Sequence, residues 1–264
     1  MVTLDLIELA DLARPEQLVD EIVRQNPELP IPVPIEELAT QAGIVKIEAF
    51  ASTGFAGALV ANETKSQGAI FYSSNDPRSR QRFTIGHELG HFLLPWHKQS
   101  SFECKAADMT FGANAAWEIE ANRFSAELLM PRRFVMQRLK QHREVELLHV
   151  RKLEREFETS FQMSARRYVE LNEYPCAVVF SKDNVVKYWV KSEYFELTLG
   201  VRNGQSLPKE SSSRDVDGDI DDWDEIDAYW WLAERRGVDQ PESIYEQTLR
   251  QENGFKVTLL TYDE

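Results

Sequence analysis

The chain has 264 residues, of which 42% are hydrophobic and 28% are charged, a composition typical of a globular protein with one large or two modest domains. The net charge of −14 argues against a general nucleic-acid binder, which needs a basic surface. The sequence contains no long apolar run that could span a membrane. Acidic residues near the start (Asp5, Glu8, Asp11) are unlike a secretory signal. We therefore predict a cytoplasmic protein.

Periodicity and capping residues predict the elements of the first half of the chain. Pro15 suits the first turn of one helix and Gly43 the C-terminal cap of another. Pro77 and Pro95 bracket a helix of roughly 77–94. In chain order we expect helices at 4–13, 14–26 and 35–43, strands at 44–50, 55–61 and 67–74, then helices at 77–94 and 115–130.

The second half is predicted to begin with short helices and to continue as a mixed α+β segment. The run 175–192 alternates as a hairpin does around its turn at 182–184. The stretch 209–227 carries nine acids and two bases, which predicts a solvated loop. In chain order we expect helices at 132–142, 144–158 and 163–174, the hairpin, helices at 226–237 and 241–251, and a final strand at 255–262.

The helix at 77–94 contains "HELGH", with His87 and His91 four residues apart. Residues at this spacing share one face of a helix, so both imidazoles can bind the same tetrahedral metal ion. Glu88 is displaced by one position and can act as a general base on a water molecule that the metal activates. Imidazole and carboxylate ligands with one open position are typical of catalytic zinc, so we predict Zn²⁺ as the cofactor.

The spacing alone leaves the third ligand open. His97 lies where one zinc-peptidase pattern places its last histidine, but that pattern needs a glycine at the position of Leu94. Proline follows here and cannot supply the positive φ that glycine permits. We therefore expect His97 to be a surface residue.

The next helix offers two carboxylates. Glu118 and Asn122 stand four apart, so that Glu118 can bind the metal while Asn122 holds a histidine ring. Glu120 points roughly 200° away from Glu118 on the helix, so only one of the two can be the ligand.

Two blocks of the sequence, "RFTIGHELGHFLL" and "EIEANRFSAELLMP", together resemble the ImmA/IrrE family of regulatory metalloendopeptidases. The resemblance covers roughly residues 34–135. In that family, both helix histidines and a glutamate of the second block bind zinc, and the glutamate between the histidines is catalytic. The resemblance thus implies His87, His91 and Glu118 as ligands and Glu88 as the base.

The family also implies a fold and a substrate. We expect an α+β protein with a zincin-like helical core and a small three-stranded sheet (1–135), a helix-turn-helix-like segment (136–174) and a small α+β domain (175–264). Known members cleave helix-turn-helix repressors, so a DNA-binding repressor is the implied partner. Arg166 and Arg167 in the second segment are too few for a phosphate-binding surface, and we expect a helical bundle there without direct nucleic-acid binding. The competing hypothesis is a binding regulator or antitoxin-like protein without peptidase activity.

Overall fold

The computed structural model describes residues 2–51, 54–97, 101–105, 116–215, 220, 222–234 and 240–263. Its contacts divide the chain into two compact units. Unit 1 comprises Met1–Arg132 with Arg155–Ser160, and unit 2 comprises Arg133–Glu154 with Phe161–Glu264. The three segments predicted from the sequence (1–135, 136–174 and 175–264) stay a prediction.

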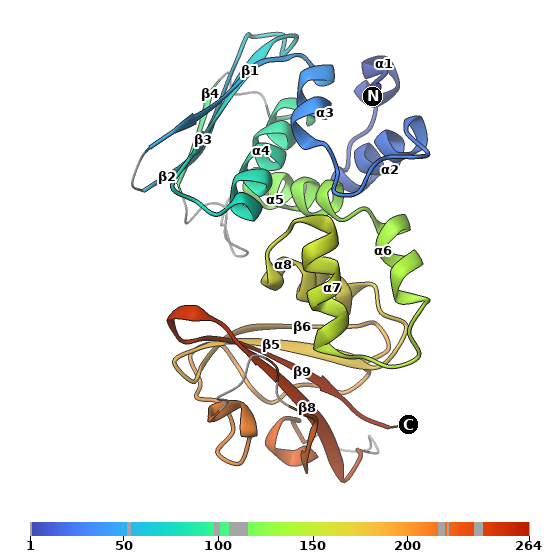
Figure 1. Ribbon diagram of the computed structural model, residues 1–264, viewed down its shortest axis with the longest axis vertical. Helices are drawn as coiled ribbons and strands as arrows, with labels where there is room; N and C mark the ends of the chain where they lie inside the picture. The colour runs from blue at the N-terminus through green and yellow to red at the C-terminus, as the bar shows by residue number, and fades with distance from the viewer. Residues whose placement is uncertain are drawn as a thin grey trace. The chain divides into compact units, whose positions relative to one another are not determined.

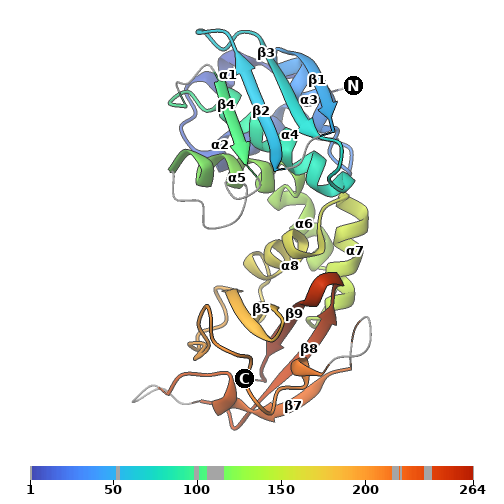
Figure 2. The same cartoon turned by 90° about the vertical axis from the view of Figure 1, so that its left-hand side faces the viewer.

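Unit 1 is a mixed sheet with helices packed on it (Figure 1). The strand order is β1-β3-β2-β4, with β1 parallel to β3 and the remaining neighbours antiparallel. Figure 2 views the strands with α4 behind them; α4 packs on β2 and β3 on one side and on α5 on the other. The elements are α1 (Leu6–Ala10), α2 (Pro15–Gln25), α3 (Ile35–Ala42), β1 (Ile44–Phe50), β2 (Phe55–Ala61), β3 (Gly68–Ser73), α4 (Arg78–Leu93), β4 (Ser101–Lys105) and α5 (Ala116–Leu129).

The predicted helices and strands of unit 1 are present, and the sheet has one strand more than the three predicted. The additional strand β4 pairs with β2 in a segment for which neither a helix nor a strand was predicted. The cap at Gly43 is as predicted, with a left-handed φ of 110°. A Cβ there would also lie 2.7 Å from the backbone oxygen of Ser66, so glycine is needed for both reasons.

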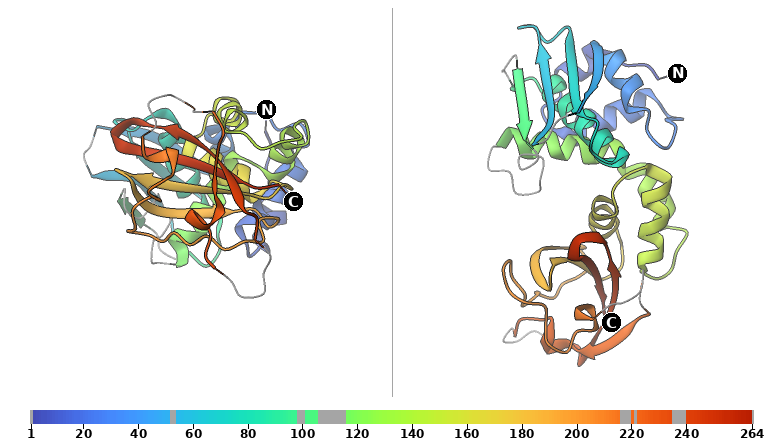
Figure 3. Two further views of the ribbon diagram at one scale, coloured as in Figure 1. Left: turned by 90° about the horizontal axis from the view of Figure 1, so that it is seen from below. Right: turned by 60° about the vertical axis from the view of Figure 1, so that its left-hand side comes forward.

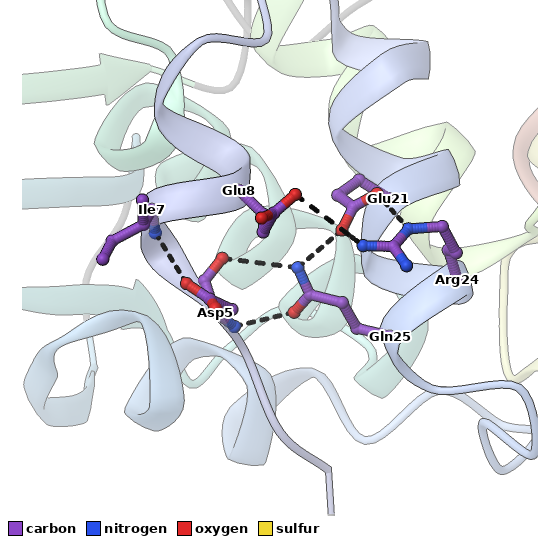
Figure 4. A network of polar contacts seen from close by, with 6 residues as sticks. All are labelled: Asp5, Ile7, Glu8, Glu21, Arg24 and Gln25. Atoms are coloured by element: carbon purple, nitrogen blue, oxygen red, sulfur yellow. Dashed lines mark hydrogen bonds and ion pairs between the residues drawn. The ribbon is translucent and has the colours of Figure 1, made fainter.

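Polar contacts fasten α1 to α2 (Figure 4). The Asp5 backbone N–H donates to Gln25 Oε1 at 2.7 Å, and Gln25 Nε2 donates to the Asp5 backbone oxygen at 3.3 Å and to Glu21 Oε1 at 2.8 Å. Arg24 donates to Glu21 from two groups, Nε to Oε2 and Nη2 to Oε1, each at 2.6 Å. A helix of five residues, such as α1, is not stable alone. Side chains of α2 therefore hold it in place.

Unit 2 contains a five-stranded antiparallel sheet in the order β6-β5-β9-β8-β7. Strands of this sheet, coloured from gold to red, are in front in the left view of Figure 3. Helix α8 packs on β5 and β6. Trp231 lies in the core of the unit, with none of its surface exposed. The elements are α6 (Arg132–Leu139), α7 (Leu147–Phe157), α8 (Phe161–Glu170), β5 (Cys176–Lys182), β6 (Val185–Lys191), η1 (Ser212–Arg214), β7 (Asp224–Asp227), η2 (Ala228–Trp230), β8 (Ser243–Arg250), η3 (Glu252–Gly254) and β9 (Phe255–Thr261).

The hairpin and the last strand of unit 2 are as predicted, and two helices are not. Residues 241–251 were predicted to be helical but contain strand β8, which pairs with β9 and β7. Residues 226–237 begin with the end of β7 and the single turn η2; 235–239 lie outside the described residues. Both errors concern residues whose strand pairing depends on distant parts of the chain.

The two arginines of the helix-turn-helix-like segment lie on α8. Arg166 Nε donates to Glu170 Oε1 at 2.8 Å, and Arg167 is 6% exposed. The expected helical bundle without direct nucleic-acid binding stays a prediction. In the described part of the chain, no helix is long and apolar enough to cross a membrane.

Candidate metal centre

The two helices that carry the site, α4 and α5, pack against each other in unit 1 (Figure 1). Their close approach depends on two glycines of α4. A Cβ at Gly86 would lie 2.5 Å from Ser125 Oγ, and one at Gly90 would lie 3.1 Å from Phe124 Cδ1 and 3.3 Å from Ala121 Cα. These glycines let the backbones approach closely and so bring the side chains of α5 to the histidines of α4.

Three of the residues predicted from the sequence come together at this contact. His87 Nε2 and His91 Nε2 are 3.0 Å apart. Glu118 on α5 reaches both, with Oε2 3.2 Å from His87 Nε2 and Oε1 3.4 Å from His91 Nε2. Within the described residues, this is the group of histidine, cysteine and acidic side chains whose geometry suits a metal ion.

The distances fit a tetrahedral zinc ion. Two ligand atoms about 2.0–2.1 Å from zinc and separated by the tetrahedral angle lie roughly 3.3 Å apart. Here the two Nε2 atoms are 3.0 Å apart, and each has a different oxygen of the Glu118 carboxylate at 3.2 or 3.4 Å. These three side chains would hold a zinc ion with the fourth position of the tetrahedron left for water or substrate.

The protonation states also suit a metal. Burial lowers the pKa of His91 to about 4. Burial alone would raise the pKa of Glu118, but hydrogen bonds with His87 and His91 outweigh it and hold this pKa at about 2. At neutral pH, His91 is therefore neutral and Glu118 is ionised, the forms in which each donates a lone pair to a metal.

The side chains behind the ligands orient both histidine rings. His87 Nδ1 lies 3.0 Å from Asn122 Oδ1, so the predicted contact of Asn122 with a histidine ring is present. His91 Nδ1 lies 2.8 Å from His97 Nδ1. When both Nε2 atoms face a metal, both Nδ1 atoms carry the ring proton. Asn122 and His97 then accept hydrogen bonds from these N–H groups.

The expectation that His97 is a surface residue was wrong. It is fully buried, with its ring stacked on Trp117 at a centroid distance of 5.7 Å. Its Nε2 is 3.0 Å from Glu120 Oε2. Pro95 ends α4 as predicted, but the turn that follows directs His97 back towards His91, which spacing along the chain does not reveal.

Lys65 is a further residue that the sequence did not indicate. Its ammonium group donates to the backbone oxygens of His91 at 2.6 Å and Leu94 at 3.1 Å. These are carbonyl groups at the C-terminal end of α4, where a cation is favourable. Burial lowers the pKa of Lys65 to about 8. Lys65 thus fixes the end of the helix that carries His91.

Glu88 is the remaining predicted residue, and it is fully buried, like His87 and His91. It follows His87 on α4, whose next turn supplies His91. A carboxylate beside two metal ligands, and not among them, is the arrangement that a zinc peptidase uses for proton transfer.

We expect Gly90→Val to lower the free energy of unfolding by about 1–3 kcal/mol, the usual cost of overpacking. The new side chain would meet Phe124 and the backbone of Ala121 and push α5 from α4. Urea unfolding measures the free energy of unfolding. A zinc titration of the same variant measures the loss of zinc affinity that follows from the displacement of Glu118. Gly90→Ala is the graded control, with a smaller loss in both measurements; unchanged stability in the valine variant would contradict the packing argument.

Part of the chain is similar to a known family of proteins. Residues 42–168 match the family model of peptidases described as the IrrE N-terminal-like domain. No curated protein matches the chain in a sequence comparison. Among solved structures, a Mycobacterium tuberculosis transcriptional regulator is similar with 12% identity and a TM-score of 0.48, over 97% of this chain and 73% of that one. The match to the IrrE N-terminal-like domain supports the resemblance of the two sequence blocks to the ImmA/IrrE family of metallopeptidases.

Proposed function

We propose that this protein is a zinc-dependent endopeptidase that acts in the cytoplasm on one specific protein, and that this substrate is a helix-turn-helix transcriptional repressor. The observation that carries the proposal is the triangle of His87, His91 and Glu118 with Glu88 beside it. The peptidase class rests on the family match. The repressor as substrate class rests on the resemblance of the two sequence blocks to the family.

The protein's own groups have separate tasks in this reaction. When bound, zinc supplies Lewis acidity, which polarises a peptide carbonyl and makes water easier to deprotonate. His87, His91 and Glu118 would hold it, with both rings fixed by Asn122 and His97 at their Nδ1 atoms. Glu88 takes the proton from the attacking water and passes it to the nitrogen of the departing amine.

A comparison of protein N-termini in cells tests this proposal. Cells that express the wild type are compared with cells that express Glu88→Gln, each with and without DNA damage. We expect a small set of new N-termini that appears only with the wild type, because a selective peptidase cuts few proteins. Those termini identify the substrate and the cleaved bond.

Identical sets of N-termini under both conditions would contradict the proposal. The protein would then be better described as a binding regulator, and the next step would be the isolation of a stable complex. Inactivity on generic peptides does not test the proposal, because a peptidase with one protein substrate need not cut them.

A further inference from the structure

The contacts behind His91 continue beyond His97. His97 lies between two polar groups: His91 on α4 meets its Nδ1 at 2.8 Å, and Glu120 on α5 meets its Nε2 at 3.0 Å. The same carboxylate oxygen, Glu120 Oε2, accepts from Trp96 Nε1 at 2.5 Å. His91, His97 and Glu120 therefore form a chain from a proposed zinc ligand to a carboxylate.

The directions of the hydrogen bonds in this chain are fixed by its first member. When His91 Nε2 faces the metal, His91 Nδ1 carries the ring proton and donates it. His97 Nδ1 must then accept, so the proton of the neutral His97 ring lies on Nε2. That N–H donates to the Glu120 carboxylate, which can only accept while ionised.

The surroundings of His97 hold its ring in this position. Its ring is fully buried, stacks on Trp117 at an interplanar angle of 30° and meets the Trp96 ring edge-on at 82°. A neutral, clamped imidazole can accept at one nitrogen and donate at the other.

Glu118 and Glu120 thus lie on one helix but contact different residues: Glu118 contacts the proposed zinc ligands, and Glu120 contacts the residues behind them. Glu118 faces the two Nε2 atoms directly. Glu120, two residues on, reaches the site only through the turn that carries Trp96 and His97. The side chain of Glu120 is 34% exposed and that of Glu118 is 17% exposed, so the outer carboxylate is the one closer to solvent.

We propose that His97 is a positioning residue for the metal centre. It accepts a hydrogen bond from the Nδ1–H group of His91 and relays the charge of Glu120 to His91. This inference rests on the proposed function, because it takes His91 as a zinc ligand. A carboxylate that acts through a histidine strengthens the lone pair of the metal-binding nitrogen and fixes its direction. Here a second imidazole lies between the carboxylate and the ligand.

The test is the zinc affinity of purified full-length variants, measured by competition with a chromophoric chelator. His97→Leu removes both hydrogen bonds at similar volume, and we expect it to weaken zinc binding by about 10–100-fold, as for other partners of metal-binding histidines. His97→Asn places an amide oxygen where Nδ1 was, and we expect it to recover most of the affinity. His142→Leu in unit 2 is the matched control and should bind zinc as the wild type does.

Glu120→Gln tests the outer part of the relay. We expect a loss of several-fold in the wild-type background and no further loss in His97→Asn, whose amide group is too short to reach residue 120. Such non-additivity is the signature of residues that act through one another. The absorption spectrum of the Co²⁺-loaded protein reports whether the tetrahedral geometry is kept in each variant.

Wild-type affinity in His97→Leu would overturn the relay alone, provided that His91→Ala abolishes zinc binding. Equal losses in His97→Leu and His97→Asn would also overturn it, because they would indicate a packing role without an acceptor. If the wild type binds no zinc, or binds it equally well without His91, the proposed function itself fails.

Discussion

Glu88→Gln is expected to lower kcat/KM on the natural substrate by about 10²–10⁴-fold, the usual contribution of a general base. The amide has the shape of the carboxylate but cannot accept the proton of the attacking water. Zinc binding should be unchanged, because the proposed ligand atoms belong to His87, His91 and Glu118. The measurements are cleavage of the substrate identified from the new N-termini and the zinc content of the purified variant.

Glu88→Asp separates the role of the charge from that of its position. It keeps a carboxylate but withdraws it by one methylene group, so an intermediate rate is expected. A Glu88→Gln protein that binds zinc and cuts at the wild-type rate would contradict the assignment of Glu88 as the base. A variant that loses zinc would show instead that Glu88 supports the metal site.

Glu118→Ala is expected to weaken zinc binding by more than about 100-fold, beyond the range known for residues that only support a ligand. The loss leaves two imidazoles and no negative charge to offset that of the metal. A competition titration with a chelator measures the change.

Glu120→Ala is the matched control, since it removes a carboxylate from the same helix. Its loss should be clearly smaller, because Glu120 contacts His97 and Trp96 and neither Nε2 atom of the site. A larger loss in Glu120→Ala than in Glu118→Ala would exchange the two roles and contradict the ligand set.

Local sequence signals predicted which side chains α4 and α5 bring together. The spacing of His87 and His91 places both on one face of α4, and that of Glu118 and Asn122 does the same on α5. Capping signals also located the helix ends at Gly43 and Pro95. The structure adds the distances between the two helices, which depend on the close contact at Gly86 and Gly90.

The errors arose where non-local contacts decide the conformation. Residues 241–251 begin with proline and contain glutamate, glutamine and leucine, all compatible with a helix, yet pairing with β9 makes Ser243–Arg250 a strand. Glu246 is buried there because it accepts from Trp231 Nε1 at 2.6 Å and from Ser211 Oγ at 2.8 Å. Those donors cannot be found from the sequence near Glu246.

His97 was misplaced for a related reason. Its spacing from His91 indicated either a third ligand or a surface residue. The buried position behind His91 depends on the turn after Pro95 and on the ring of Trp117, which the spacing does not reveal. The partner of Glu120, His97, lies on this same turn. Glu120 reaches it although its side chain leaves α5 in a different direction from that of Glu118.

The most direct test of the central claim is X-ray absorption at the zinc edge of the purified, zinc-loaded protein. We predict one zinc ion per chain, bound by two imidazole nitrogens and one carboxylate oxygen at about 2.0–2.2 Å, with a water molecule as the fourth ligand. In the spectrum of Glu118→Ala, the signal of this zinc site should be absent. A shell that contains sulfur at about 2.3 Å, or four protein ligands with no water, would contradict a catalytic zinc site at His87, His91 and Glu118.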